Sequence, residues 1–266
     1  MHHFTYTEAL PGVYHIQDMM GVCMTLLVGE EQALLVDAGY GLEDVSAFVR
    51  TLTDKPVTLV LTHAHHDHAL GARWFDKALM FPQERAVYDT YTREPYVTRV
   101  AGQAAGKGLA VPTDWAEGTM AAPVDLAEGP MDLGGLTAEI ILCPGHTPGS
   151  AVIWMPERQL LLSGDDWNPC TWDFFPESLG AEDFRRNVSS QLSLPFAHVL
   201  CSHQPMLKAR ADFESFFTGL TDEALRTARK VDMGWPLDTR EASPAPGQIF
   251  VFDYGKTSFA AMEEEQ

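Results

Sequence analysis

Residues 62–68 constrain the fold and the chemistry of this chain more than any other stretch. They directly follow residues 57–61, an apolar and β-branched run that predicts a buried strand. The candidate metal ligands in the stretch are His63, His65, Asp67 and His68. Imidazoles and carboxylates are costly to bury without a polar or ionic partner. The stretch therefore predicts a divalent metal site, and its ligands suit zinc as well as iron, nickel or manganese.

Length and composition predict one packed globular unit. With 266 residues, the chain is long enough for a single large domain over 1–266, with an insertion or lid at about 82–131. Apolar residues make up 45% of the chain and charged residues 21%, a balance typical of a folded core. The net charge of −19 argues against nucleic-acid and anionic membrane partners, because both bind basic surfaces. A small-molecule substrate stays compatible, since a bound metal dominates the charge inside a pocket.

The cellular compartment is predicted from what the sequence lacks. No apolar run reaches the length of about 18 residues that a membrane-spanning helix needs. The N-terminus has neither the basic nor the hydrophobic region of a secretory signal. The cysteines, Cys23, Cys143, Cys170 and Cys201, form no Cys-x-x-Cys pair. Such scattered cysteines favour a reducing cytoplasm over a disulfide framework.

The apolar pattern predicts alternating strands and helices. Strands are expected at 25–28, 33–36, 57–61, 137–142, 151–154, 159–162, 197–201 and 249–252. Helices are expected from Leu42 to near Pro56, from Pro82 onward, and over 184–194 and 213–229. The glycine-rich segment 101–108 reads either as a mobile lid or as an exposed surface loop. This order favours two sheets with helices outside them over one parallel sheet.

Extended geometry groups the first candidate ligands into two pairs. Residues two apart on a strand point to the same side, so His63 and His65 are expected to bind one ion together. Asp67 and His68 begin a predicted helix and are better placed to hold a second ion nearby.

More candidate ligands end apolar runs in the same way. His146, Asp165 and His203 each follow a predicted strand after a few small or polar residues. Such strand ends are the usual place for functional side chains on a rigid scaffold. Two rival residues lie close by, His198 and Asp166, although His198 precedes its strand.

These motifs together resemble the metallo-β-lactamase superfamily. The matching segments are 63–68, 144–149, 163–165 and 202–203, and 36–39 resembles an early family motif. They occur in the family's order. The resemblance implies an α/β fold, a four-layer αββα sandwich of two mixed β-sheets with helices on the outer faces and a dinuclear site at one edge.

The resemblance also implies a role for each candidate ligand. It implies that the first metal is bound by His63, His65 and His146, that the second is bound by Asp67, His68 and His203, and that Asp165 bridges the two. The residue directly after the glycine matches the family, which favours Asp165 over Asp166. Asp37 is expected to support the site without binding a metal.

The expected reaction is hydrolysis by a hydroxide shared between two divalent ions. Zinc is the first expectation, with iron or manganese as alternatives. Metal binding lowers the pKa of water from about 15.7 to about 7, so a hydroxide forms without a strong base. Asp67 and Asp165 are the expected catalytic residues. A bridging aspartate resembles the thioesterase and lactonase branches of the family more than its antibiotic hydrolases, which favours ester, thioester or lactone substrates.

Other functions share this ligand set. A non-haem iron oxidoreductase resembling persulfide dioxygenases is the main alternative, because such ligands choose metals loosely. A phosphodiesterase and a non-catalytic binding module also stay open, and the sequence does not predict the oligomeric state.

The segment after Asp165 is the expected substrate wall. Its candidate contacts are Trp167, Asn168, Thr171 and Trp172. One interpretation gives them an apolar surface for an acyl or aromatic group, with the polar residues fixing orientation. The other interpretation packs the aromatic residues under the loop as a small satellite core.

Overall fold

The computed structural model describes residues 3–113 and 115–264. These residues form sheets of seven, six and four strands. The first sheet contains, in spatial order, β1 (Thr5–Leu10), β2 (Val13–Gln17), β3 (Cys23–Val28), β4 (Ala33–Val36), β5 (Val57–Val60), β6 (Lys77–Met80) and β7 (Ala122–Asp125). The strands predicted at 25–28 and 33–36 are present as the antiparallel neighbours β3 and β4. From β4 to β7 the strands run parallel, so their carboxyl ends meet at one edge of the sheet.

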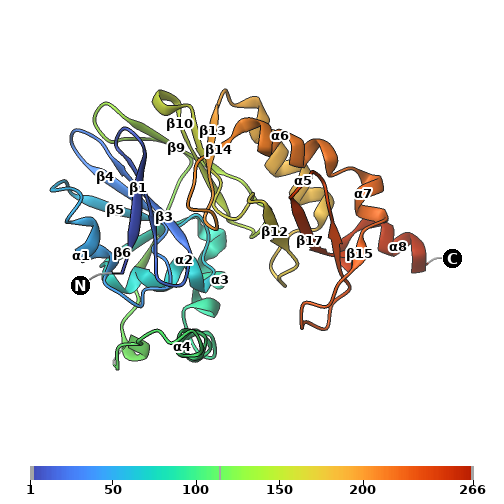
Figure 1. Cartoon of the computed structure of the whole chain (residues 1–266), viewed down its shortest axis with the longest axis horizontal. Helices are drawn as coiled ribbons and strands as arrows, with labels where there is room; N and C mark the ends of the chain where they lie inside the picture. The colour runs from blue at the N-terminus through green and yellow to red at the C-terminus, as the bar shows by residue number, and fades with distance from the viewer. Residues whose placement is uncertain (1–2, 114, 265–266) are drawn as a thin grey trace.

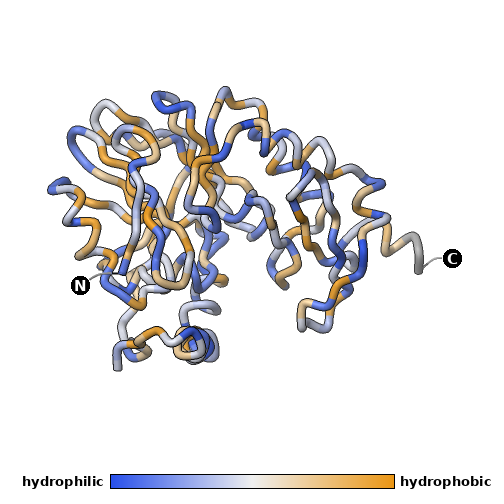
Figure 2. Tube along the Cα trace, in the orientation of Figure 1, coloured by the Kyte–Doolittle hydropathy of each residue, from blue (hydrophilic) through white to orange (hydrophobic). Residues whose placement is uncertain are grey.

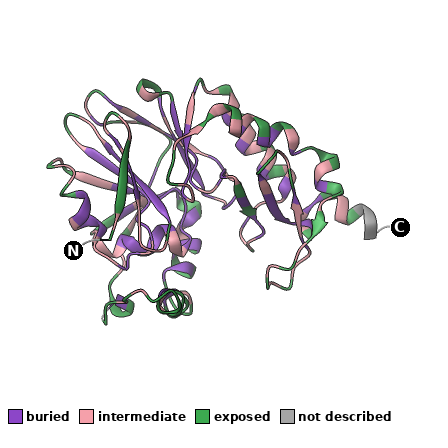
Figure 3. Ribbon diagram, in the orientation of Figure 1, coloured by how far each residue is buried: buried purple, intermediate pink, exposed green. Residues whose placement is uncertain are grey.

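The second sheet faces the first. Its spatial order is β14 (Lys208–Ala209), β13 (His198–Leu200), β11 (Leu160–Leu162), β10 (Ala151–Met155), β9 (Thr137–Leu142) and β8 (Gly129–Asp132). Strands β11 and β13 are parallel, and β10 is antiparallel to both of its neighbours, β9 and β11. Leu34 and Val60 of the first sheet pack against Ile153 and Leu160 of the second, and all four are fully buried. Figure 3 shows this buried interior against the exposed outer strand β1.

Helices cover the outer faces of both sheets. Helix α1 (Val45–Val49) and helix α3 (Arg85–Tyr91) pack on the first sheet through residues such as Phe48 and Tyr88. Helix α5 (Ala181–Ser189) and helix α6 (Arg210–Gly219) pack on the second through Phe184 and Phe213. Hydropathy follows the layers, with apolar residues along the strands and polar residues in the outer loops (Figure 2). The sequence's prediction of an αββα sandwich is confirmed.

A third sheet extends the molecule beyond the sandwich. It joins β12 (Cys170–Asp173), β17 (Ile249–Asp253), β16 (Thr239–Ala242) and β15 (Arg229–Lys230). Helices α5 and α6 separate it from the second sheet, and α7 (Asp222–Arg226) and α8 (Ser258–Glu264) lie at its far end (Figure 1). The strand expected at 249–252 is present as β17 and pairs with β12. The sequence suggested that the segment containing β12 was a loop. Phe250 and Phe252 fill this outer core.

The expected helix over 213–229 is wrong in its extent. Helix α6 stops at Gly219, and α7 begins after Thr221, whose side chain caps it. A Cβ at Gly219 would lie 1.7 Å from the carbonyl oxygen of Pro244. This close approach to the 243–249 loop requires glycine and coincides with the break.

The insertion at 82–131 is more ordered than the sequence suggests. Residues 101–106, expected as loop or lid, form the second half of α4 (Tyr96–Gly106). Alanine is the best helix former, and Val97, Val100 and Ala104 give this helix a buried face. The remaining short helices are α2 (His66–Ala69) and the 3₁₀ turns η1 (Leu70–Trp74), η2 (Pro82–Glu84), η3 (Trp115–Glu117), η4 (Pro156–Arg158), η5 (Ser190–Ser193) and η6 (Tyr254–Lys256). Among the described residues, no helix combines the length and apolar character that crossing a membrane requires.

Candidate metal centre

Strand ends from both sheets bring the sequence-predicted ligands to one edge of the sandwich. His63 follows β5, His146 follows β9, Asp165 follows β11 and His203 follows β13. Their ligand atoms form three overlapping groups, each within 4.8 Å. The groups are His63, His65 and His146; His63, His68 and Asp165; and Asp67, His68 and His203. All seven predicted metal ligands therefore lie together, although their role as ligands stays a prediction.

In the first group, each imidazole has one nitrogen fixed from outside. The Nδ1–H of His63 donates to the Thr62 hydroxyl at 3.1 Å, since that hydroxyl donates to Asp37. The Nε2–H of His65 donates to the Glu177 carboxylate at 2.5 Å. Outer partners of this kind set the tautomer and orientation of metal-binding histidines.

His146 shows why this group needs a cation. Its Nδ1–H donates to the Trp172 carbonyl at 2.7 Å, which leaves Nε2 with a lone pair. That Nε2 lies 2.9 Å from Nδ1 of His65, whose own proton is on the side facing Glu177. The Nε2 of His63 is buried, points into the same group and has no hydrogen-bond partner among the described residues.

The converging nitrogens of His63 and His146 do not carry extra protons at neutral pH. Burial, followed by the nearby imidazoles, lowers the pKa of His63 well below its usual value. Burial and His65 lower the pKa of His146 to about 4. Both rings are therefore neutral at pH 7, and a divalent metal fits the nitrogens they present.

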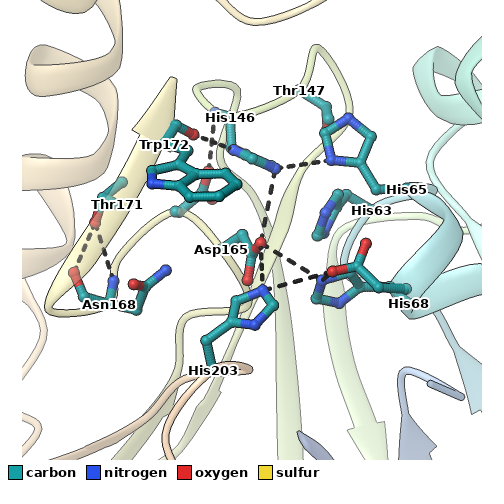
Figure 4. A network of polar contacts seen from close by, with 12 residues as sticks. His63, His65, His68, His146, Thr147, Asp165, Asn168, Thr171, Trp172 and His203 are labelled. Carbon is teal, nitrogen blue, oxygen red and sulfur yellow. Dashed lines mark hydrogen bonds and ion pairs between the residues drawn. The ribbon is translucent and has the colours of Figure 1, made fainter. Parts of the chain in front are cut away.

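Asp165 lies between two of these groups (Figure 4). The first group is His63, His65 and His146, and the second group is Asp67, His68 and His203. Its Oδ2 is 3.0 Å from Nε2 of His203, 3.5 Å from Nε2 of His68 and 3.8 Å from Nε2 of His146. Asp67 Oδ2 lies 3.7 Å from the Nε2 atoms of both His68 and His203. One carboxylate oxygen thus faces ligands of both groups, which is the arrangement that a bridging role requires.

Opposite charges dominate the second group. Burial alone would raise the pKa of Asp67, but His68, His66 and His203 lower it to about 2. Burial would also raise the pKa of Asp165, but His203 and His68 hold that pKa well below its usual value. In return these carboxylates outweigh burial and raise the pKa values of His68 and His203. A second cation bound by this group would therefore displace protons from His68 and His203.

Asp37 lies behind both groups and contacts His68 and Thr62, the residue before His63. Its carboxylate accepts from the backbone N–H of Thr62 at 2.7 Å, from the Thr62 hydroxyl at 2.8 Å and from Nδ1 of His68 at 2.9 Å. The residue has a φ of 64°, a strained conformation for a residue other than glycine. Asp37 therefore connects the outer sides of His63 and His68.

Two glutamates were missed by sequence reasoning. Glu177 fixes His65, and the fully buried Glu84 accepts from the backbone N–H groups of Ala64 at 2.9 Å and Gly149 at 2.8 Å. Glu84 thus ties the loop of His63 and His65 to the loop after His146. Nothing in the local sequence marks either glutamate, because each acts on residues distant along the chain.

Glycine is required where two ligand loops cross. Gly164 precedes Asp165 and has a φ of +54°. A Cβ there would lie 2.8 Å from Oγ1 of Thr62, the residue before His63. A side chain at this position would push apart the segments that carry His63 and Asp165.

A cavity of about 550 Å³ opens beside the two groups. Asn168 and Trp172 line it, so their predicted substrate contact stays possible and remains a prediction. Trp167 is fully buried and packs against Phe213, and the buried Thr171 hydroxyl bonds to the backbone of Asn168. Trp167 and Thr171 do not line the cavity, because their side chains lie in the protein interior.

The two rival ligands lie outside the metal groups of the described chain. His198 is in β13, paired with Ala209. The buried Asp166 accepts from the backbone N–H of His146 at 3.2 Å, and burial raises its pKa to about 8. Asp165, not Asp166, faces the histidines.

Fold and site together define a class of protein. Residues 20–166 match the family model of the metallo-beta-lactamase superfamily. The match covers more than half of the chain, so the chain belongs to this superfamily of metal-binding hydrolases.

Individual relatives are distant. The chain is 25% identical over 147 residues to a probable metallo-hydrolase, YqgX, of Bacillus subtilis (52% of this chain, 63% of the relative). It is 27% identical over 175 residues to the acyl-coenzyme A thioesterase MBLAC2 of Gallus gallus (54% and 60%). These matches span less than two thirds of either relative.

The structural likeness extends further along the chain. The stereoselective inverting sec-alkylsulfatase Pisa1 from Pseudomonas sp. superposes with a TM-score of 0.62 at 16% identity, covering 83% of this chain and 42% of that protein. At this identity the likeness concerns the fold alone.

Proposed function

We propose that this protein is a metal-dependent hydrolase that cleaves an ester, thioester or lactone bond in a small molecule. The observation that carries the proposal is the convergence of lone-pair nitrogens from His63, His65 and His146, each ring held from outside. The neighbouring group of Asp67, His68 and His203 shares Asp165 with it, which supports two ions. When bound, these ions would polarise the carbonyl and lower the pKa of a bound water to about 7.

The residues of the chain have definite tasks in this reaction. Asp67 has a pKa of about 2 and is therefore an anion at neutral pH. Its side chain lines the cavity, where the carboxylate can orient the attacking water by accepting its hydrogen bond. Asn168 also lines the cavity; its Oδ1 accepts from the backbone N–H of Cys170 at 2.9 Å, so its NH₂ group is the part that can donate to a substrate.

Thioesters are the first substrates to test. The cavity carries aromatic residues, which suit an apolar acyl group. A thioesterase is also among the distant relatives. An oxidoreductase and a phosphodiesterase remain alternatives, since the donor set itself does not choose among these reactions.

A substrate panel on metal-loaded protein tests this proposal. Zinc-, manganese- and iron-loaded samples are given acyl thioesters, aryl esters, lactones, phosphodiesters and alkyl sulfates, with oxygen uptake recorded in parallel. We expect turnover of a carbonyl substrate without oxygen uptake, and at least about a 100-fold loss of kcat in Asp165→Ala. Oxygen consumption without hydrolysis, or turnover confined to phosphate or sulfate esters, would overturn the proposal.

A further inference from the structure

One face of helix α4 forms a wall of the cavity. Tyr96, Arg99 and Gln103 all line the cavity and are spaced as neighbours on one helix face. The adjacent face, Val97, Val100 and Ala104, is buried in a cluster with Leu42, Leu70 and Trp115. This packing fixes which side chains α4 turns toward the candidate metal centre.

Arg99 is the cation of this wall. No other arginine and no lysine is among the described residues that line the cavity. The guanidinium of Arg99 lies 5.1 Å from the centre of the Tyr96 ring. No ion pair joins Arg99 to a carboxylate within the described residues, whereas Arg93, just before the helix, is paired with Asp89 at 2.7 Å. The chain has 37 acidic and 18 basic residues, so an unpaired arginine is not explained by a shortage of acids. Arg99 is therefore available to an anion from outside.

Aromatic side chains line much of the cavity that Arg99 shares with the predicted metal ligands, and Tyr96 and Tyr91 lead from Arg99 to His65. They come from the loop after β4, from the insertion and from segments in or beside the third sheet: Tyr40, Tyr91, Tyr96, Trp172, Phe175 and Trp235. Tyr91 and Tyr96 have ring centres 4.4 Å apart, and Phe175 and Trp235 have theirs 6.4 Å apart. Aromatic walls of this kind bind flat or apolar groups.

Resting on the proposed hydrolase function, we propose that the substrate is an amphipathic anion. Its scissile ester, thioester or lactone bond lies at the metal groups, its apolar body packs against the aromatic walls, and a carboxylate or phosphate pairs with Arg99. A cavity of about 550 Å³ limits that body to a small molecule. The planar guanidinium matches both oxyanions through two parallel hydrogen bonds.

Binding of non-reactive analogues tests the anion site without requiring hydrolysis. The probes are the N-methyl amides of 4-phenylbutanoic acid and of the same acid with a carboxylate or a phosphonate at the para position. Quenching of tryptophan fluorescence in the full chain reports binding, since Trp172 and Trp235 line the cavity. The variants are Arg99→Gln, Arg99→Lys and, as a matched control outside the cavity, Arg93→Gln.

We expect the charged amides to bind at least about tenfold more tightly than the neutral amide, less so at high salt. Arg99→Gln should abolish that preference, Arg99→Lys should retain part of it, and Arg93→Gln should leave it intact. The carboxylate and phosphonate probes show which anion the site prefers. Equal affinity for neutral and charged amides, or a preference that survives Arg99→Gln, would overturn the proposal.

Matched methyl thioesters separate this inference from the proposed function. The oxygen of water bonds to the acyl carbon, the C–S bond breaks and the sulfur takes a proton, which gives the carboxylic acid and methanethiol; the methanethiol is measured as released thiol. Hydrolysis of neutral and charged thioesters with equal kcat/KM would leave the hydrolase standing and reject the anion site. Selective binding of the charged amides without thioester hydrolysis would support the anion site and count against the hydrolase.

Discussion

Glu84 connects two ligand loops through one buried carboxylate. Each of its oxygens accepts a backbone N–H, one from Ala64 between two predicted ligands and one from Gly149 beyond His146. A Cβ on Gly149 would approach Cγ of Glu84 to 2.8 Å, so the loop and the glutamate are in direct contact. Glu84 is buried and does not line the cavity, so it is a positioning residue.

Replacing Glu84 tests this connection. In Glu84→Gln the amide NH₂ cannot accept, so one buried N–H loses its partner at a cost of about 1–3 kcal/mol. We expect metal affinity to fall about 10–100-fold, measured by competition with a fluorescent chelator. The exposed Glu31→Gln is the control and should bind metal normally. Unchanged affinity in Glu84→Gln would show that the loops hold their positions without it.

The two ligand groups should differ in proton release. The pKa values of His63 and His146 are lowered, so the first group is already deprotonated at pH 7. The pKa values of His68 and His203 are raised, so their protons must leave when a cation binds. Raised pKa values mean that affinity for the second ion weakens as pH falls, about tenfold per pH unit for each proton displaced.

Calorimetry in buffers of different ionisation enthalpy measures these protons directly. Between pH 6 and 8, the second equivalent of metal should release more protons than the first. Equal proton release for both equivalents, or none, would contradict the assignment of charge to the two groups.

At the scale of the element, helix α4 was the least predictable part near the site. Its Ala- and Gly-rich second half suggested a loop, and only tertiary packing of Val97, Val100 and Ala104 shows why it is helical. By contrast, β5 and the ligand run after it could be predicted, because a continuous buried strand and the 63–68 spacing are local signals. Elements that depend on distant partners give no such signal.

Paired substitutions in α4 should change its stability in opposite directions. Val100→Ala removes buried methyl groups at a cost of about 1–3 kcal/mol. Gly102→Ala adds a Cβ that meets nothing within 4 Å and should stabilise the helix by about 0.5–1 kcal/mol. Amide hydrogen exchange over 96–106 should become faster in the first variant and slower in the second. Identical exchange in both would show that α4 does not open independently of the protein.

At the scale of the whole molecule, the sandwich and the clustering of the ligands could be predicted, but the third sheet could not. Apolar runs and the order of the ligand motifs can be read directly from the sequence, so they can be recognised without knowledge of the fold. The pairing of β12 with β17 joins segments almost eighty residues apart, and Trp172 of β12 stays half exposed in the cavity. Glu84 and Glu177 likewise meet their partners only after folding.

The central claim is that side chains from both sheets hold two divalent ions at one edge of the sandwich. Anomalous diffraction from crystals of the zinc-loaded protein measures this most directly. The account predicts two peaks, one among His63, His65 and His146 and one among Asp67, His68 and His203, with Asp165 beside both. No peak within these groups, or zinc bound only elsewhere on the protein, would contradict it.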